Sequence, residues 1–214
     1  MTRLGVLGGT FDPVHLGHLA VARVAAAALH LDGVRFIPSR VPPHRSGPHA
    51  SAADRLAMTT LAVEGTPGWS VSDLELRRDG PSYSYDTLTA LAAAEHLAPS
   101  QICFLIGADA FAEIATWSRY PAVLDLAHFV VVARPGFGLD QLRARVPALA
   151  QRMTTPHALA EAPPGATRIV LLEAATPDVS STAIRAATAR GESLEHLVSA
   201  PVARYIRQHG LYGA

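Results

Sequence analysis

The first forty residues constrain the fold most, because two apolar runs flank a segment with helical periodicity. The run Leu4 to Leu7 predicts a short buried strand that ends at a pair of glycines. Leu16 to Leu29 repeats apolar residues at helical spacing, and Val34 to Pro38 is a second apolar run. A strand, helix and strand of this combined length predict a βαβ unit with parallel strands.

The remaining sequence continues the alternation of strands and helices, without repeats and without a linker long enough to divide the chain. This order predicts an α/β protein with a doubly wound, mostly parallel, Rossmann-like sheet that binds ligands at the carboxyl ends of its strands. We expect a single domain over residues 1–214, with a small helical part from about residue 180. The loop from Ser39 to Ala50 is rich in Pro and His, so we expect it to be exposed and a candidate lid. The further elements expected are a helix opened by Ser51 and Asp54 and running to about Glu64, a strand pair around Val71 to Leu76, a helix capped by Ser84 and running through His96, strands at Ile102 to Gly107 and Phe129 to Ala133, a helix over 139–153, a strand at Arg168 to Leu172, and helices at Ser180 to Arg190 and Pro201 to Gln208.

Composition excludes several classes of protein. About half of the residues are hydrophobic, which is enough to bury a core in one domain. Eighteen basic residues, all of them Arg, balance eighteen acidic ones, so no broad positive field would hold a nucleic acid, and few aromatics are present to stack on RNA bases. The apolar run before Asp12 is too short for a secretory signal, and no stretch approaches a membrane span. Cys103 is a single cysteine in an apolar run, so we expect a cytoplasmic protein without disulfides.

The segment between the first strand and the first helix carries the strongest chemical signal. Gly8 and Gly9 let the backbone approach a ligand closely, and Thr10 adds a hydroxyl, which together suit an anion. His15 and His18 are three residues apart at a helix start, so they share one face near the positive end of the helix dipole. The alternative is a tight turn with two solvated histidines, although a turn does not require that imidazole pair.

A second candidate anion site lies near the end of the sequence. Ser180, Ser181 and Thr182 place hydroxyls and amides at a predicted helix start. Arg185 follows one turn inside that helix, where its guanidinium can reach a bound phosphate. Taken alone, the same residues would most often be only a helix cap.

The two motifs together resemble those of the nucleotidyltransferase superfamily, which also includes the class I aminoacyl-tRNA synthetases. The first motif, with Gly17 between its histidines to let a base or ribose lie against the helix, resembles the (H/T)xGH signature. The second is similar to the ISSTxIR motif of adenylyltransferases. Synthetases carry a second signature rich in Lys, which this chain cannot supply. The resemblance implies that His18 stabilises charge at the α-phosphate, that His15 holds neighbouring oxygens, and that Arg185 grips the leaving group.

A third segment indicates the acceptor substrate. Residues 81–88, together with Trp117, resemble the bacterial nicotinate mononucleotide adenylyltransferases. That resemblance implies that backbone amides and a hydroxyl around Ser84 bind the nicotinate carboxylate, while Trp117 stacks on the pyridine ring. Ser84 stands where the family has Thr, which keeps the hydroxyl. Without the resemblance, Trp117 would be a surface or core aromatic.

Several further positions match the family less specifically. Asp109, just past a strand that ends at Gly107, could hold a ribose or position the metal-bound nucleotide, or simply cap a helix. His44 and Arg45 match a PPHR segment that contacts substrate phosphate, and a polar loop is the competing explanation. Arg134 matches an RPG segment near the adenine, where a strand-ending turn would look identical.

The activity implied is transfer of the adenylyl group of ATP to nicotinate mononucleotide, with Mg²⁺ held by the ATP phosphates and no metal ligands from the protein. The expected partners are these small molecules, with no nucleic acid and no membrane, and a homo-oligomer is possible. Phosphopantetheine adenylyltransferase or another small-molecule nucleotidyltransferase is the enzymatic alternative, and a nucleotide-binding regulator is the non-enzymatic one. The residues predicted to be catalytic are His18, His15 and Arg185; those for ATP are Gly8, Gly9, Thr10, Phe11, His15, His18, Gly107, Asp109, Arg134, Ser180, Ser181, Thr182 and Arg185; and those for nicotinate mononucleotide are Ser39, His44, Arg45, Tyr83, Ser84, Tyr85 and Trp117.

Overall fold

A computed structural model describes residues 2–42, 47–133, 136, 138–160 and 165–213. Three of the predicted site residues, His44, Arg45 and Arg134, lie outside the described residues.

The amino-terminal βαβ unit is confirmed. Strand β1 (Leu4–Gly9) leads through a loop into helix α1 (Leu16–Leu29), and β2 (Gly33–Pro38) returns beside β1. The two strands pair in parallel from Leu4 opposite Gly33 to Gly9 opposite Pro38. A parallel neighbour can be reached only by a crossover, and α1 provides it.

The described residues form a seven-stranded sheet in which each neighbouring pair of strands is parallel, in the order β3-β2-β1-β4-β5-β7-β6. The predicted doubly wound α/β class is therefore correct. The other strands are β3 (Trp69–Val71), β4 (Ile102–Gly107), β5 (His128–Val132), β6 (Met153–Thr154) and β7 (Ile169–Leu172), and the other α-helices are α2 (Ala52–Val63), α3 (Ser84–Glu95), α4 (Ala108–Phe111), α5 (Leu139–Arg145), α6 (Pro156–Ala160), α7 (Ser181–Ala189) and α8 (Ala200–Gln208).

Helices cover both faces of the sheet, and the strands are correspondingly apolar on both sides. Along β4, Cys103 and Leu105 belong to one buried cluster, while Phe104 and Ile106 belong to the other. This alternation follows from the two-residue period of a strand, and strands buried on both faces read as continuous apolar runs. Helices α1, α2, α7 and α8 pack on the first face, and α3, α4 and α5 pack on the second.

Three expected elements differ from the structure. The strand pair around Val71 to Leu76 was wrong: only β3 forms, and the following residues make turns closed by bonds such as Arg78 N to Glu75 O. Ser84 does not cap α3 but is its first residue, and Tyr83 occupies the cap position. The helix over 139–153 breaks into α5 and a 3₁₀-helix, because Pro147 has no amide hydrogen to continue α5.

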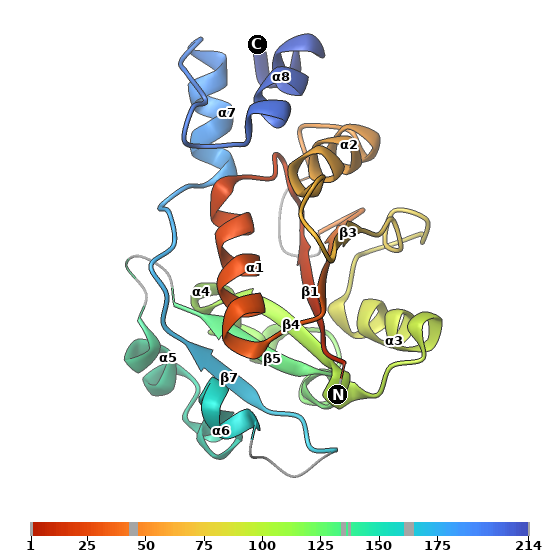
Figure 1. Ribbon diagram of the computed structural model, residues 1–214, viewed down its shortest axis with the longest axis vertical. Helices are drawn as coiled ribbons and strands as arrows, with labels where there is room; N and C mark the ends of the chain where they lie inside the picture. The colour runs from red at the N-terminus through yellow and green to blue at the C-terminus, as the bar shows by residue number, and fades with distance from the viewer. Residues whose placement is uncertain (1, 43–46, 134–135, 137, 161–164, 214) are drawn as a thin grey trace.

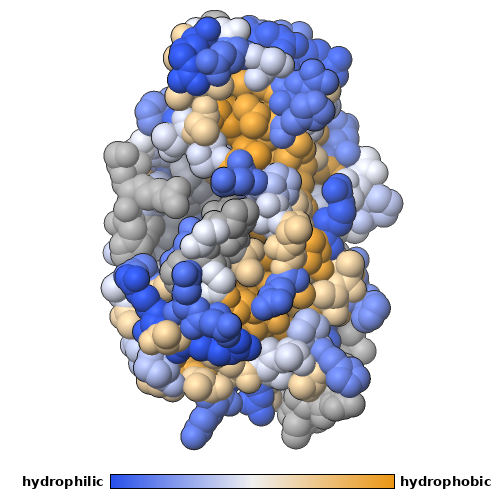
Figure 2. Space-filling view, turned by 90° about the vertical axis from the view of Figure 1, so that its left-hand side faces the viewer, coloured by the Kyte–Doolittle hydropathy of each residue, from blue (hydrophilic) through white to orange (hydrophobic). Residues whose placement is uncertain are grey.

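The loop after β2 also differs from expectation at its two ends. Ser39 and Ala50 are buried, although the segment between them was predicted to be an exposed lid. Ser51 does cap α2 as predicted, since its hydroxyl accepts the Asp54 amide. Among the described residues, the large hydrophobic side chain that is exposed is Val41, and on the face drawn in Figure 2 apolar residues lie in recesses bordered by hydrophilic ones. No helix in the described part of the chain is long and apolar enough to cross a bilayer.

The strand order places a crevice at the end of β1. The chain builds β2 and β3 on one side of β1 and then crosses to the other side to form β4. At such a switch point the flanking loops diverge and leave space at the carboxyl ends of the strands. Helices α7 and α8 lie beyond that edge, next to the start of α1 (Figure 1). Their residues Ile184, Val202 and Ile206 share the cluster of α1, which supports our proposal of one domain over residues 1–214.

Candidate active site

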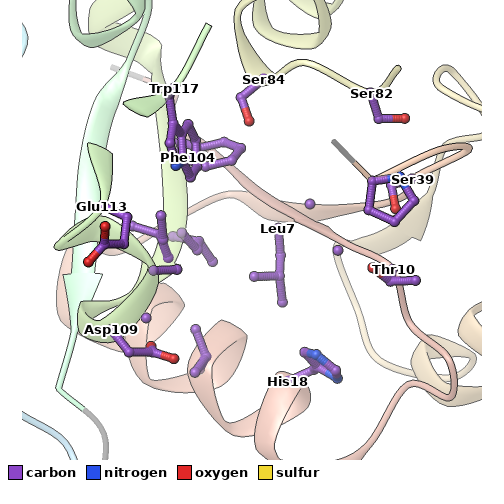
Figure 3. Close-up of a pocket in the computed structure, with 18 of the residues that line it drawn as sticks. Leu7, Thr10, His18, Ser39, Ser82, Ser84, Phe104, Asp109, Glu113 and Trp117 are labelled. Atoms are coloured by element: carbon purple, nitrogen blue, oxygen red, sulfur yellow. The ribbon is translucent and has the colours of Figure 1, made fainter. Parts of the chain in front are cut away.

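A cavity of about 600 Å³ opens at the switch point, between the ends of β1 and β4. The end of β1 contributes Gly8, Gly9 and Thr10, and the end of β4 contributes Gly107 followed by Asp109. Trp117 and Ser84 lie on one side of this acceptor cavity and His18 on the opposite side, with Leu7 between them (Figure 3).

The side of the acceptor cavity away from His18 suits a flat polar ring. The Trp117 and Phe104 rings meet edge to face, with centroids 6.1 Å apart, so the Phe104 ring fixes the tilt of the indole. Ser82 and Ser84 bring hydroxyls to the same wall. An aromatic surface beside hydroxyls can stack on a ring and bind a polar substituent of that ring.

A second cavity of about 570 Å³ lies beside the first and is lined mainly by polar groups. Thr10, His18 and Asp109 line both cavities, so the two adjoin at these residues. This phosphate cavity brings together the two predicted anion sites, which are more than 160 residues apart in the sequence: Thr10, His15 and His18 from the first, and Ser180, Ser181, Thr182 and Arg185 from the second.

The two histidines are fixed by the first turn of α1. His15 is the cap residue, and its ring stacks on that of His18 with centroids 3.7 Å apart. The His15 amide donates to His18 Nδ1 at 3.2 Å. Because Nδ1 accepts this bond, a neutral His18 carries its proton on Nε2, which is then the nitrogen able to donate to a ligand. Placement at the amino end of α1 adds positive potential to the same space.

Gly17 has a different role from the one expected. A side chain there would meet the His15 ring at 3.0 Å and the Pro177 carbonyl at 3.5 Å, so the protein's own atoms occupy that space. Gly17 therefore makes room for the His15 ring, not for a base or ribose. Phe11 likewise lies in the core, where its ring packs edge-on against His18 with centroids 5.0 Å apart.

Arg185 is held at the mouth of the phosphate cavity by the amino-terminal loop. Its Nη1 donates to the Asp12 carbonyl oxygen at 2.8 Å, and its Nη2 donates to Thr182 Oγ1 at 3.2 Å. The Ser181 hydroxyl donates to the Pro13 carbonyl at 2.9 Å, so the start of α7 is fastened to the same loop. These bonds fix the guanidinium of Arg185 in the cavity that His15 and His18 also line.

Asp12 is a site residue that sequence reasoning missed. Its side chain is 5 % exposed, and it accepts bonds from the His49 amide at 2.8 Å and the Ala50 amide at 3.0 Å. Burial pushes the pKa of Asp12 upward, but these amides, the Tyr212 hydroxyl and the Arg185 charge together hold it below its ordinary value. The sequence could have indicated Asp12 only by its position between the glycine pair and the histidines, because its hydrogen-bond partners lie far away along the chain.

Glu75 was also missed and lies in the wall of the acceptor cavity. The residue is 6 % exposed, and its carboxyl accepts a 2.6 Å bond from Thr87 Oγ1. Burial raises the pKa of Glu75. Hydrogen bonds from Thr87 and Ser82 and the charge of Arg78 lower this pKa, but they offset only part of the rise. The carboxyl thus ties the turn after β3 to the start of α3, and it holds the serine segment of the cavity.

The raised pKa predicts how Glu75→Gln changes the pH dependence of stability. Because the folded pKa lies above the unfolded value of 4.5, the stabilising contribution is complete below that pH and is lost as pH rises through the folded pKa. Gln keeps the shape and the acceptor oxygen but does not ionise. Thermal unfolding should show similar midpoints at about pH 4.5 and a more stable variant at about pH 8. Glu64→Gln, on the exposed end of α2, is the control, and a constant difference between Glu75→Gln and wild type at all pH values would contradict the assignment.

The structure brings most of the predicted residues to the two cavities, but not all. Tyr83 and Tyr85 lie beside Ser84 in α3, yet neither is among the described residues that line a cavity. Instead, Tyr85 packs under the Arg119 guanidinium, 4.7 Å from the ring centroid. The residues present are Gly8, Gly9, Thr10, His18, Ser39, Ser84, Gly107, Asp109 and Trp117 in the acceptor cavity, and His15, Ser180, Ser181, Thr182 and Arg185 in the phosphate cavity.

Comparisons with known proteins identify the family of the chain. Residues 6–187 match the cytidylyltransferase-like family. A protein from Aeromonas salmonicida named "Probable nicotinate-nucleotide adenylyltransferase" is 44 % identical to the chain, and the alignment covers 99 % of the chain and 97 % of the relative. A protein of the same name from Symbiobacterium thermophilum is 43 % identical, and the alignment covers 99 % of the chain and 96 % of the relative. A solved structure of the Plasmodium falciparum nicotinic acid mononucleotide adenylyltransferase, complexed with NaAD, aligns with a TM-score of 0.74 at 16 % identity, covering 99 % of this chain and 98 % of that one.

At 16 % identity the structural likeness establishes the fold alone, whereas the full-length relatives establish the family. The chain belongs to the cytidylyltransferase-like family and, within it, to the nicotinate-nucleotide adenylyltransferases.

Proposed function

We propose that this enzyme transfers the adenylyl group of ATP to nicotinate mononucleotide, forming nicotinate adenine dinucleotide and pyrophosphate in the biosynthesis of NAD. The observation that carries the proposal is the position of His18, which lines both cavities. A triphosphate in the phosphate cavity and a mononucleotide in the acceptor cavity would meet at this residue.

Little general base chemistry is required of the protein. The phosphate of a mononucleotide is already an anion at neutral pH and can attack the α-phosphorus directly. A bond forms between that phosphate oxygen and the α-phosphorus, the bond to the β-phosphate oxygen breaks, and pyrophosphate leaves with the electron pair. The protein must therefore align two anions and stabilise the negative charge on the oxygens of the transition state.

The cationic and donor groups of the phosphate cavity are placed for these tasks. We assign charge stabilisation at the α-phosphate to His18 through Nε2, and binding of neighbouring oxygens to His15. Arg185 and the start of α7, with Ser180, would bind the leaving pyrophosphate. The helix α7 starts with its Ser180 cap accepting the Ala183 amide at 3.1 Å.

Members of this nucleotidyltransferase family use ATP with a divalent cation, which we propose to be Mg²⁺. The described residues contain no group of three or more His, Cys, Asp and Glu side chains able to hold a metal. We propose that the cation is carried mainly by triphosphate oxygens and water, as Mg²⁺ typically is in proteins that bind nucleotides. When bound, it would neutralise part of the phosphate charge.

The acceptor cavity supports a pyridine nucleotide as the second substrate. Trp117 would stack on the pyridine ring, and the segment around Ser84 would bind the carboxylate. A cytoplasmic location, a homo-oligomeric state and the roles of His44, Arg45 and Arg134 stay predictions.

The proposed reaction is tested by offering different acceptors with MgATP and measuring pyrophosphate release. Nicotinate mononucleotide should be preferred over nicotinamide mononucleotide, and phosphopantetheine should be inert. A preference for phosphopantetheine would identify the rival adenylyltransferase, and the absence of turnover with any acceptor would favour a nucleotide-binding regulator.

His18→Ala should lower kcat by roughly 100-fold or more while the KM values of both substrates change little, because the imidazole acts mainly in the transition state. Steady-state kinetics would measure this. His209→Ala, at an exposed histidine that lines neither described cavity, is the control. A near-normal kcat for His18→Ala would remove His18 from the role assigned to it.

Trp117→Ala should raise KM for nicotinate mononucleotide more than KM for ATP, because only the former would lose a stacking surface. The other tryptophan, Trp69, lies in β3 and packs against Phe36, so Trp69→Ala is the matched control. Equal increases in both KM values for Trp117→Ala would contradict the placement of the pyridine ring.

A further inference from the structure

The terminal turn Leu211–Gly213 contacts a residue of the phosphate cavity through one partly buried hydrogen bond. The Tyr212 hydroxyl donates to Asp12 Oδ1 at 2.8 Å, joining residues 200 positions apart. The desolvation of this hydroxyl and its bond to Asp12 raise the pKa of Tyr212, so the tyrosine stays a neutral donor. Asp12 itself lines the phosphate cavity.

Asp12 connects four separate segments of the chain at this point. Oδ1 accepts from Tyr212 and from the Ala50 amide, and Oδ2 accepts from the His49 amide. The Asp12 backbone carbonyl accepts from Arg185 Nη1, which also lies 3.9 Å from Oδ2. The loop before α1, the segment before α2, helix α7 and the terminal turn therefore converge on one aspartate.

The backbone of Tyr212 indicates that this contact is specific. Its φ is 61°, in the left-handed region that residues other than Gly adopt at a cost. Tyr212 belongs to the terminal 3₁₀ turn Leu211–Gly213, and its side chain packs partly buried against the core. A strained conformation persists where surrounding contacts hold it, and here the bond to Asp12 is one such contact.

A buried arginine, Arg55, supports the same junction through the residues next to Asp12. Arg55 is 1 % exposed, and its Nη1 donates to the Thr10 carbonyl at 2.8 Å and to the Ser39 carbonyl at 2.6 Å. Its charge faces Asp12 and Tyr212. Thr10 lines both cavities. In the loop before α1, Arg55 therefore holds the backbone at Thr10, and Tyr212 holds the side chain of Asp12.

We infer that Tyr212 is a positioning residue for the triphosphate: by holding the Asp12 carboxylate, its hydroxyl sets the orientation of Arg185 and of the loop before α1 before ATP binds. The inference rests on the proposed function, because it treats the phosphate cavity as the ATP site. Tyr212 does not line that cavity among the described residues, so its effect on ATP is transmitted through Asp12 and Arg185.

The chain contains a matched control for this contact. Tyr205, on α8, also donates its hydroxyl to an aspartate, Asp54 Oδ1, at 3.0 Å. Asp54 lies in α2 and lines neither described cavity. Tyr205→Phe and Tyr212→Phe therefore each remove one tyrosine hydroxyl that donates to an aspartate, and of the two aspartates only Asp12, the partner of Tyr212, lines the phosphate cavity.

The experiment measures the Kd of wild type and both variants for an ATP analogue with an uncleavable α,β-bridge, and then the KM for each substrate. Tyr212→Phe should weaken analogue binding about five- to tenfold, which is less than the roughly 10- to 150-fold of a hydrogen bond made directly to a charged group, because the effect reaches ATP only through Asp12 and Arg185. It should raise KM for ATP similarly and leave KM for nicotinate mononucleotide within about twofold. Tyr205→Phe should leave both within about twofold. Equal effects of the two variants, or unchanged analogue binding by Tyr212→Phe, would overturn the inference.

A measurement on wild type covers the case in which Tyr212→Phe does not fold. Adding the analogue should slow amide exchange in residues 209–213 as well as around the phosphate cavity, since coupling between two sites is reciprocal. Unchanged exchange at 209–213 would refute the inference. The two proposals fail separately: binding of ATP with no adenylyl transfer to any acceptor defeats the proposed function, whereas normal transfer with unaltered ATP binding by Tyr212→Phe defeats only the role of Tyr212.

Discussion

The position of β1 within the sheet is the constraint on which the rest of the site depends. Because β1 pairs with β2 on one side and β4 on the other, the loops leaving β1 and β4 diverge and open the acceptor cavity. The same strand leads through a short loop into α1, whose first turn fixes both histidines. The pairing of the strands thus decides where the two imidazoles lie, and the hydrogen bond from the His15 amide then fixes the orientation of His18.

The two cavities differ in chemistry because different elements build them. Apolar strand residues such as Leu105 and Ile106 reach the acceptor cavity, so it can take a ring. The phosphate cavity is bounded by helix starts and loops, which provide imidazoles, hydroxyls and a guanidinium. His18 belongs to both, and its Nδ1 is occupied by the His15 amide. A ligand group at the junction of the two cavities would therefore meet His18.

Local sequence signals predicted most of the fold, whereas contacts between distant segments escaped them. Apolar runs and helix caps, each within a stretch of about ten residues, predicted the elements of the βαβ unit and also β4, β5 and α7. Glu75 was assigned to a strand pair, yet its carboxyl is buried against Thr87, a contact that only the tertiary structure supplies. Tyr212 and Arg55 carry no local mark of their roles, since their partners Asp12, Thr10 and Ser39 are far away in sequence.

A carboxylate in a cavity that would bind phosphate is at first unexpected, because like charges repel. Both oxygens of Asp12 are occupied by amides and a tyrosine hydroxyl, and the Arg185 guanidinium lies close to Oδ2. These groups lower the pKa of Asp12, so the charge is kept and compensated within the protein. Arg185 Nη1 donates to the Asp12 carbonyl at 2.8 Å and lies 3.9 Å from the nearer carboxylate oxygen, so the ion pair is long. The charge of Arg185 therefore stays available to a ligand. The aspartate therefore orders the cationic residues without neutralising the site.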